Sequence, residues 1–165
     1  MIKKTTDIEM VEIRRGTIDD LPQVHALIKE LAEFERAPQE VTTTIYEMER
    51  DGFGENPIFK FFVAEGENGI VGIALYYTAY STWKGRTLYL EDLVVTEFMR
   101  RTGVGRKLFN AVAQEAKETG AKRFRWQVLD WNEPAIAFYK KIGAELSSEW
   151  LTCTLTEEQI QQYAG

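Results

Sequence analysis

The segment Leu88-Tyr-Leu-Glu-Asp-Leu-Val-Val95, followed after Thr96–Met99 by Arg100-Arg-Thr-Gly-Val-Gly105, decides the fold of this chain. The first part has the alternating apolar residues that are typical of a strand, and the second is a glycine turn that opens a helix. Such a turn directs several backbone N–H groups and the positive end of a helix toward one point. The sequence therefore predicts a site for a phosphate-bearing cofactor here, with Glu91 and Asp92 close to it on the strand.

The residues after this turn predict a strand–helix–strand unit. Gly103–Thr119 carries one apolar stripe at helical spacing, and Gly120 stands where a helix C-cap belongs. Arg123–Leu129 has the pattern of a further strand. A strand, a helix and a strand in this order predict a crossover between two parallel strands.

The remaining segments predict a mixed sheet with helices on both faces. Tyr80–Arg86 is expected to be a loop with an exposed Trp83 at its centre, and Glu67-Asn-Gly69 is a hairpin signal. Strands are expected at residues 11–15, 58–64, 70–78, 87–95, 123–129 and 146–155, and helices at 17–34, 42–51 (closed by Gly52), 103–119, 132–142 and 156–163. We predict an α/β (α+β) fold in which residues 1–165 form a single domain.

The composition excludes several classes of protein. Acidic side chains outnumber basic ones by 26 to 20, and the net charge of −6 disfavours a broad nucleic-acid-binding face. No run of 18 apolar residues is present, so we expect no membrane span. Met1–Thr6 is not followed by an apolar stretch and Cys153 is the only cysteine, so we expect a cytoplasmic protein without a signal peptide. We expect Cys153, in an apolar strand-like run, to be a buried structural thiol.

The spacing of the residues around Gly103 and Gly105 does not match either of two familiar phosphate-binding motifs. A Walker loop needs Gly-Lys-Ser or Gly-Lys-Thr, whereas Gly105 is followed by Arg106, Lys107 and Leu108. A dinucleotide fingerprint needs a third glycine, at the position that Leu108 occupies here. Gly103 and Gly105 also suit a tight turn that binds no ligand, so their spacing alone leaves both interpretations open.

Several motifs together resemble one family. Arg100–Gly105 after one strand, and Asn132–Gly143 after the next parallel strand, resemble the two signature segments of the GNAT family of acetyl-coenzyme A-dependent N-acetyltransferases. Four further segments resemble the diamine (spermidine/spermine) and thialysine acetyltransferase branch of that family: Leu31–Glu35, Asp51–Gly54, Leu88–Asp92 and Trp131–Pro134. The resemblance extends from about Val11 to Trp150. It implies the GNAT fold, in which the fourth and fifth strands splay apart.

The resemblance implies that acetyl-coenzyme A is the co-substrate, with its pyrophosphate on the backbone N–H groups of the glycine turn. Its pantetheine arm is expected along a bulged fourth strand, where the N–H at about Val94 polarises the thioester carbonyl. Gly105 leaves room for the phosphates, and Arg101 departs from the glycine that animal relatives often carry. The cofactor-binding residues that the resemblance implies are Leu93, Val94, Val95, Arg100, Arg101, Thr102, Gly103, Val104, Gly105, Arg106, Asn132 and Tyr139.

Two catalytic residues follow from the same resemblance. Tyr139 matches the general acid that protonates the leaving coenzyme A thiolate. Glu91 matches the acidic residue near the amine, whose ordinary pKa of about 10.4 requires a group that takes its proton, directly or through water. Asp92, on the alternate face of the strand, is interpreted as a structural hydrogen-bond acceptor. His25 is expected at the surface or the edge of the core, and we expect no metal site.

The sequence leaves two classes of acceptor amine open, lysine-like amino acids and diamines or polyamines. The residues implied to line its site are Phe34, Glu35, Trp83, Glu91, Arg125, Trp126, Gln127 and Glu149. Ser81 stands where the polyamine branch carries an acidic residue, and its neighbours with Val128–Asn132 look like the thialysine branch, which acetylates the side-chain amine of lysine-like amino acids. Arg125 is our candidate partner for such a substrate's carboxylate. A diamine or polyamine is the alternative, because Glu35 and Glu149 suit a distal cation.

Two other classes of function stay open. One is a non-catalytic acyl-coenzyme A-binding module, against which the intact Glu91 and Tyr139 argue. The other is a protein-lysine acetyltransferase, which would need an open groove. The resemblance also implies a homodimer with active sites close to the subunit interface.

Overall fold

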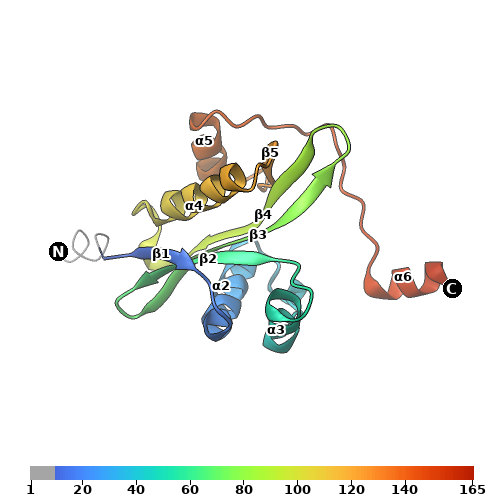
Figure 1. The fold of residues 1–165 in the computed structure, drawn as a ribbon, viewed down its shortest axis with the longest axis horizontal. Coiled ribbons are helices and arrows are strands. Elements are labelled where there is room, and N and C mark those ends of the chain that lie inside the picture. Colours follow the sequence, from blue (N-terminus) through green and yellow to red (C-terminus); the bar gives the residue numbers. More distant parts are fainter. Residues whose placement is uncertain (1–9) are drawn as a thin grey trace. The chain divides into compact units, whose positions relative to one another are not determined.

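The computed structural model describes residues 10–165, in two compact units that divide between Gln127 and Val128 (Figure 1). Residues 1–9, which include the Met1–Thr6 segment where we expect no signal peptide, lie outside the described residues. That the whole chain forms a single domain stays a prediction. Within residues 10–165, no helix is both long and apolar enough to cross a membrane.

The first unit is built on a five-stranded sheet with the strand order β1-β2-β3-β4-β5. Its strands are β1 (Glu12–Arg15), β2 (Lys60–Gly66), β3 (Gly69–Ser81), β4 (Gly85–Val95) and β5 (Arg123–Trp126). Neighbouring strands are antiparallel except β4 and β5, which are parallel. The predicted mixed sheet with one parallel crossover is confirmed.

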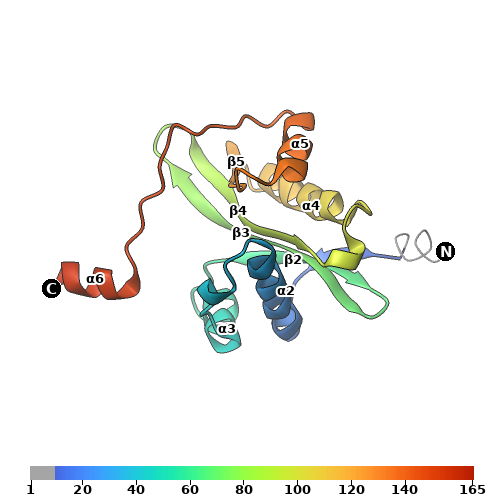
Figure 2. The same ribbon diagram turned by 180° about the vertical axis from the view of Figure 1, so that it is seen from behind.

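Helices cover both faces of this sheet, as predicted (Figures 1 and 2). The α-helices of the unit are α2 (Leu21–Phe34) and α3 (Ile45–Phe53) on one face and α4 (Val104–Glu118) on the other. Three short 3-10 helices join the elements: η1 (Ile18–Asp20), η2 (Pro38–Glu40) and η3 (Glu97–Met99).

One hydrophobic cluster of the unit lies between α2, α3 and the sheet, and α4 buries Val104, Leu108 and Val112 in addition. The first cluster consists of the buried side chains Leu21, Val24, Leu27, Met48, Phe61, Val63, Ile73, Leu75 and Val94. Burying one such side chain stabilises the fold by about 1.5–3 kcal/mol, and the stripe of α2 that carries three of them fixes this helix on the sheet.

Side-chain caps set where the helices begin and end. The Thr44 hydroxyl accepts the N–H of Glu47 at 3.2 Å, and the Glu47 carboxylate accepts the N–H of Thr44 in return. This capping box begins α3 at Ile45, three residues later than expected. Gly52 does not close the helix but lies within it, because Phe53 packs edge-on against the ring of Phe61 at 5.9 Å and holds the last turn.

The hairpin of β3 and β4 is longer than predicted. The expected loop Tyr80–Arg86 is wrong in extent, because strand pairing continues to Ser81 opposite Gly85. Gly85 has a φ of +92°, a left-handed conformation that lets the chain reverse within three residues. Trp83 lies at the tip of the turn and is 84% exposed, as expected.

Strand β5 is shorter than the predicted Arg123–Leu129. It pairs with β4 only from Thr87 opposite Arg123 to Leu90 opposite Trp126. Beyond Leu90 the two strands no longer pair, so the splay that the GNAT fold implies is confirmed.

The second unit contains α5 (Glu133–Lys141) and α6 (Glu157–Ala164). The Asn132 side chain caps α5 by accepting the N–H of Ala135 at 3.4 Å, which confirms the predicted start of this helix. The predicted strand at 146–155 is wrong, since this segment has no ladder partner in the described chain. Without a partner strand its alternating pattern buries nothing, and Cys153 is exposed rather than buried.

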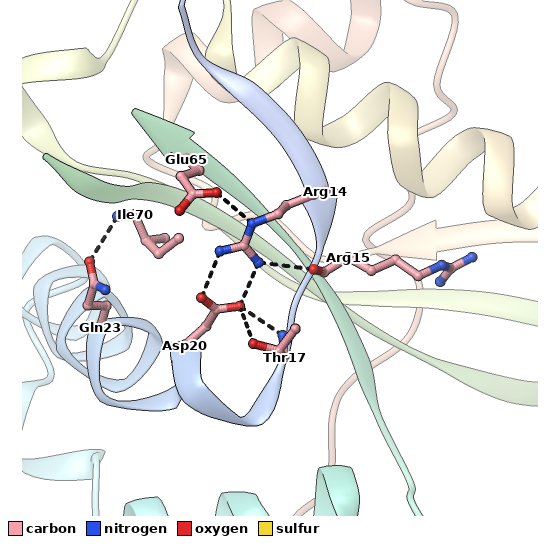
Figure 3. A network of polar contacts seen from close by, with 7 residues as sticks. All are labelled: Arg14, Arg15, Thr17, Asp20, Gln23, Glu65 and Ile70. Carbon is pink, nitrogen blue, oxygen red and sulfur yellow. Dashed lines mark hydrogen bonds and ion pairs between the residues drawn. The ribbon is translucent and has the colours of Figure 1, made fainter. Parts of the chain in front are cut away.

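A polar network ties β1 to η1 and β2 (Figure 3). The Arg14 guanidinium donates to both carboxylate oxygens of Asp20, at 2.8 and 2.9 Å, and through Nε to Glu65 at 2.6 Å. Asp20 also accepts the N–H and hydroxyl of Thr17. The hydrogen bonds from Arg14 lower the pKa of the buried Asp20 carboxyl to about 2.

We expect Arg14→Gln to lower the free energy of unfolding at pH 7 by about 2–4 kcal/mol, because Asp20 would remain buried without its paired charge. The pKa of Asp20 is depressed in the folded chain. The stabilisation is therefore present above its ordinary pKa of 3.8 and is lost as the pH falls toward 2. Urea unfolding at pH values from 7 down to about 2 should show the difference from wild type shrinking over this interval.

Arg50→Gln is the matched control. Arg50 pairs with Asp51 at the surface, where its side chain is 61% exposed, so we expect stability close to that of wild type. An equal loss of stability in the two variants would contradict the special role of the Arg14 network.

Candidate active site

A cavity of about 450 Å³ opens on the face of the sheet that α2 and α3 cover. Much of its wall is apolar, with Ile28, Leu31, Ala32, Met48, Phe59 and Leu75 among the lining side chains. Four acidic residues also line it, namely Glu40 of η2, Glu35, Glu91 and Asp92. We call this cavity, with the side chains of Glu35, Glu91 and Asp92, the carboxylate pocket.

A β-bulge brings two neighbouring acids into this pocket. Across β3 and β4, Leu75 pairs with Asp92 and Tyr76 pairs with Leu90, so Glu91 is an extra residue without a partner. In a regular strand, successive side chains point to opposite faces, whereas a bulge re-aims one of them. Glu91 and Asp92 therefore line the same cavity. The bulge that the family resemblance implies in this strand is confirmed.

The interpretation of Asp92 as a structural hydrogen-bond acceptor is wrong. In residues 10–165 its carboxylate has no hydrogen bond and no ion pair, although the side chain lies largely out of solvent. Burial, with the charges of Glu91 and Glu35, raises the pKa of Asp92 to about 6. Burial also raises the pKa of Glu35. Unpaired carboxylates in an apolar cavity favour a cationic ligand and mark a functional site.

Two tyrosines of the β3–β4 hairpin lie near Glu91. The rings of Tyr77 and Tyr89 stack at 5.2 Å between centroids. Burial and then the charge of Glu91 raise the pKa of both phenols. Arg125, which pairs with Tyr89 across β4 and β5, opposes this shift, so it lies within electrostatic reach of Tyr89.

His25 lies at the opposite wall of the cavity from these strands, on α2. It is partly buried, with its Nε2 atom 2.7 Å from the carbonyl oxygen of Thr43. The expectation of a core-edge histidine is confirmed.

The glycine turn before α4 presents unpaired backbone donors. The N–H groups of residues 101–105 have no acceptor in the described part of the chain. The N–H of Arg100, in contrast, donates to the carbonyl of Glu97 at 3.2 Å. Arg101 and Gly103 have φ values of +63° and +92°, so both occupy the left-handed region. This conformation explains why a glycine suits the position of Arg101.

Gly105 has no role that the protein's own packing requires. Its φ lies outside the left-handed region, and a Cβ placed on it would meet only Val95 Cγ2, at an ordinary 3.6 Å. The fold would tolerate a side chain here, so the bare backbone is left for a ligand. The turn therefore fits the pyrophosphate of acetyl-coenzyme A.

Beyond Leu90, one edge of β4 is free of β5. Thr96 donates its N–H to Val71 on β3 at 2.9 Å. Because backbone groups alternate along a strand, Leu93 and Val95 direct their N–H groups away from β3, toward the side where pairing with β5 has ended.

The structure separates some of the residues expected at the amine site. Phe34 lies under the guanidinium of Arg100, with 4.9 Å from the Cζ atom to the ring centroid. Trp126 packs against Phe109 of α4 at 5.1 Å, on the face of the sheet opposite the carboxylate pocket. Glu35 and Glu91 are the expected acceptor-site residues that line this pocket.

Three expected site residues belong to the second unit. Asn132 is the N-cap of α5, and Tyr139 on that helix is 8% exposed, with a pKa raised by burial. Glu149 lies in the exposed segment before α6. The sequence did not predict that Asp92 lines the pocket beside Glu91, because the pattern of residue types does not reveal a bulge.

Comparison with known proteins agrees with this geometry. Residues 22–144 match the Acetyltransferase (GNAT) family, and the chain belongs to this family. Members of the family transfer an acetyl group from acetyl-coenzyme A to an amine, so this protein is an acetyl-coenzyme A-dependent N-acetyltransferase.

The chain is similar over nearly its whole length to one named group of enzymes. It is 40% identical to a thialysine N-epsilon-acetyltransferase of Mus musculus, with 93% of this chain and 96% of that protein covered. It is 33% identical to a spermidine/spermine N(1)-acetyltransferase-like protein of Homo sapiens, over 98% of this chain and 25% of that protein. An aminoglycoside acetyltransferase structure from an uncultured soil metagenomic sample superposes with a TM-score of 0.75 at 25% identity, covering 90% of this chain and 98% of that one.

We expect Asp92→Asn to stabilise the protein while lowering its activity. The pKa of Asp92 is about 6 in the folded chain and ordinarily 3.8, so ionising this group costs stability as the pH rises through 6. At pH 7.5 the variant should gain on the order of 1–3 kcal/mol of unfolding free energy. At about pH 2.5, well below both pKa values, the carboxyl is protonated in the folded and the unfolded chain, and the gain should vanish. Thermal unfolding at both pH values measures it.

Asp19→Asn is the control for this substitution. Asp19 is exposed in η1, far along the chain from the pocket, and we expect neither stability nor activity to change. A destabilised Asp92→Asn variant at pH 7.5 would show that the carboxylate has a structural partner after all.

Proposed function

We propose that this N-acetyltransferase transfers the acetyl group of acetyl-coenzyme A to the side-chain amine of a small, lysine-like amino acid such as thialysine. The observation that carries the proposal is the bulge at Glu91, which brings the carboxylates of Glu91 and Asp92 into one cavity beside the free edge of β4. A primary ammonium group matches such a cavity in charge.

In this proposal the carboxylates prepare the nucleophile. An amine reacts only after losing a proton, and its ordinary pKa is about 10.4. Glu91 takes that proton, directly or through a water molecule, with Asp92 beside it as a second acceptor. A carboxyl group with a pKa of about 6 is ionised at neutral pH and is a far better match for a proton acceptor than an ordinary aspartate.

The transfer then makes one bond and breaks another. The amine nitrogen bonds to the acetyl carbon, and the bond from that carbon to sulfur breaks as coenzyme A leaves as a thiolate. Tyr139 donates its phenolic proton to the thiolate, and burial favours the neutral form that can donate. Asn132 contacts the cofactor in this proposal, from the start of the same helix.

The cofactor is held by backbone atoms of the first unit. Its pyrophosphate accepts the N–H groups of residues 101–105, together with that of Arg106, and the positive end of α4 adds a favourable interaction of about 0.3–1 kcal/mol. Its pantetheine arm lies along Leu93–Val95. The direction of the N–H groups favours Leu93 over Val94 as the donor to the thioester carbonyl.

A lysine-like acceptor is supported by two observations. The similarity to thialysine N-epsilon-acetyltransferases covers almost the whole of both chains. Ser81, at the end of β3, offers no charge for a second ammonium group. Arg125 is our candidate for the substrate's carboxylate, with Trp83, Gln127 and Glu149 as further members of the site, whereas Trp126 packs against α4 on the other face of the sheet. A polyamine is the second candidate, because Glu35 lies in the pocket and one relative is a spermidine/spermine acetyltransferase-like protein.

We further propose a cytoplasmic homodimer that needs neither a metal, a nucleic acid nor a membrane. Large apolar side chains of the second unit, such as Trp150, Leu151 and Tyr163, are 74%, 89% and 88% exposed. Apolar surface of this kind supports a protein partner for that segment. Sedimentation equilibrium measures the dimer.

A release assay for the coenzyme A thiol tests the acceptor. With thialysine, lysine, putrescine, spermidine and a lysine-containing peptide at equal concentrations, kcat/KM should be highest for thialysine. A preference for spermidine would favour the polyamine alternative, and a preference for the peptide would favour a protein-lysine acetyltransferase. Tight binding of coenzyme A without turnover of any amine would identify a non-catalytic binding module.

Gly105→Asp tests the cofactor site. We expect loss of measurable acetyl-coenzyme A binding in calorimetry, because the new carboxylate occupies the position of the phosphates and repels them. The melting temperature should stay near that of wild type, since the fold accepts a Cβ there. Asn110→Asp adds the same charge on the exposed face of α4 and serves as the control. Equal binding by Gly105→Asp and the control would refute the assignment.

A further inference from the structure

The carboxylate of Glu30, on α2, holds the connection between β4 and α4. Its Oε1 atom accepts the backbone N–H of Glu97 at 2.8 Å, and its Oε2 atom accepts the hydroxyl of Thr96 at 3.0 Å. It also pairs with the Arg100 guanidinium at 3.5 Å. One side chain thus contacts three points of the segment that leads into the glycine turn.

Arg100 is fixed from three sides. Besides Glu30, its Nε atom donates to the carbonyl of Val95 at 3.1 Å, and its guanidinium lies over the ring of Phe34. Its backbone N–H donates a hydrogen bond to the carbonyl oxygen of Glu97. With both its backbone donor and its side chain engaged in the protein, Arg100 shapes the turn and leaves phosphate binding to the residues that follow it.

The same helix serves the carboxylate pocket. Leu31 of α2 and Glu35, the C-cap of this helix, line the cavity, while Glu30 and Phe34 reach the connection before the turn. The two groups of residues alternate along the C-terminal end of one helix. The position of the turn relative to the pocket is therefore set by α2.

We propose that Glu30 is a positioning residue that sets the glycine turn for the pyrophosphate of acetyl-coenzyme A. This inference rests on the proposed role of that turn. Glu30 touches neither the amine nor the thioester; it acts through Thr96, Glu97 and Arg100. The negative charge of Glu30 is balanced by Arg100 and by the N–H of Glu97. We call the contacts of Glu30 with Thr96, Glu97 and Arg100 the Glu30 clamp; because of this balance, it adds little repulsion toward a phosphate.

A rival interpretation gives Glu30 the opposite effect. If Glu30 only kept Arg100 away from the cofactor, its removal would free a guanidinium for the phosphates and tighten binding. If Glu30 only stabilised the fold, its removal would harm every substrate alike. The test must separate these three outcomes.

The experiment compares acetyl-coenzyme A with acetyl-pantetheine, which carries the thioester but lacks the pyrophosphate. For Glu30→Ala we expect kcat/KM to fall about tenfold with acetyl-coenzyme A, through a higher KM, and to change less than about twofold with acetyl-pantetheine. Glu33→Ala is the matched control, because Glu33 is exposed on the same helix and should change neither value.

An equal fall with both acetyl donors, or tighter binding of acetyl-coenzyme A, would overturn the proposal. Glu30→Gln keeps the size of the side chain but loses the charge, and should give an intermediate effect of about threefold. An unchanged KM in this variant would also overturn it, which keeps the test decisive if Glu30→Ala fails to fold. Calorimetric titration of coenzyme A without amine separates the two proposals. Failure of wild type to bind would refute the cofactor site itself, whereas equal binding by wild type and both Glu30 variants would refute only the role of Glu30.

Discussion

The bulge at Glu91 is the constraint on which the rest of the site depends. Strand β3 offers partners for Leu90 and Asp92 but none for the residue between them. Because of the extra residue, the side chains of Glu91 and Asp92 both point into one cavity. The pairing of β4 with β5 ends at Leu90, next to this bulge. An acidic cavity and a free strand edge thus occur at the same level of β4. In a regular strand the two neighbouring acids would have pointed to opposite faces of the sheet.

Asp92 is held in the pocket at a cost in stability. Asp92 has no partner in the described chain, and its raised pKa records the penalty of its burial beside Glu91 and Glu35. Arg14 and Asp20 show the contrasting case, in which a buried carboxylate is fully satisfied and its pKa is lowered. The unpaired Asp92 favours the binding of a cationic ligand, whereas the Arg14–Asp20 pair stabilises the contact of β1 with its neighbours.

Helix α2 unites the two halves of the site. Its buried stripe packs on the sheet, its C-terminal turns line the carboxylate pocket, and Glu30 reaches the segment before the glycine turn. An amine and a thioester must meet within a few ångströms for acetyl transfer, so a rigid element that contacts both binding regions fixes their separation.

Local pattern was enough to predict most elements of the first unit. The apolar stripe of α4 and the glycines around residue 103 act within a few residues of themselves, so the sequence predicts them directly. The strand at 146–155 was mispredicted because a strand depends on a partner that local pattern does not reveal.

The sequence by itself determined the family, the crossover between β4 and β5, and the glycine turn with its free N–H groups. Only the tertiary structure decided that Asp92 joins Glu91 in one pocket, that Trp126 faces away from it, and that Glu30 holds the turn. The physical reason is distance along the chain. A helix cap or a turn is formed by residues that are neighbours in the sequence. A bulge depends on the opposite strand, and the Glu30 clamp joins residues that are 66 to 70 positions apart.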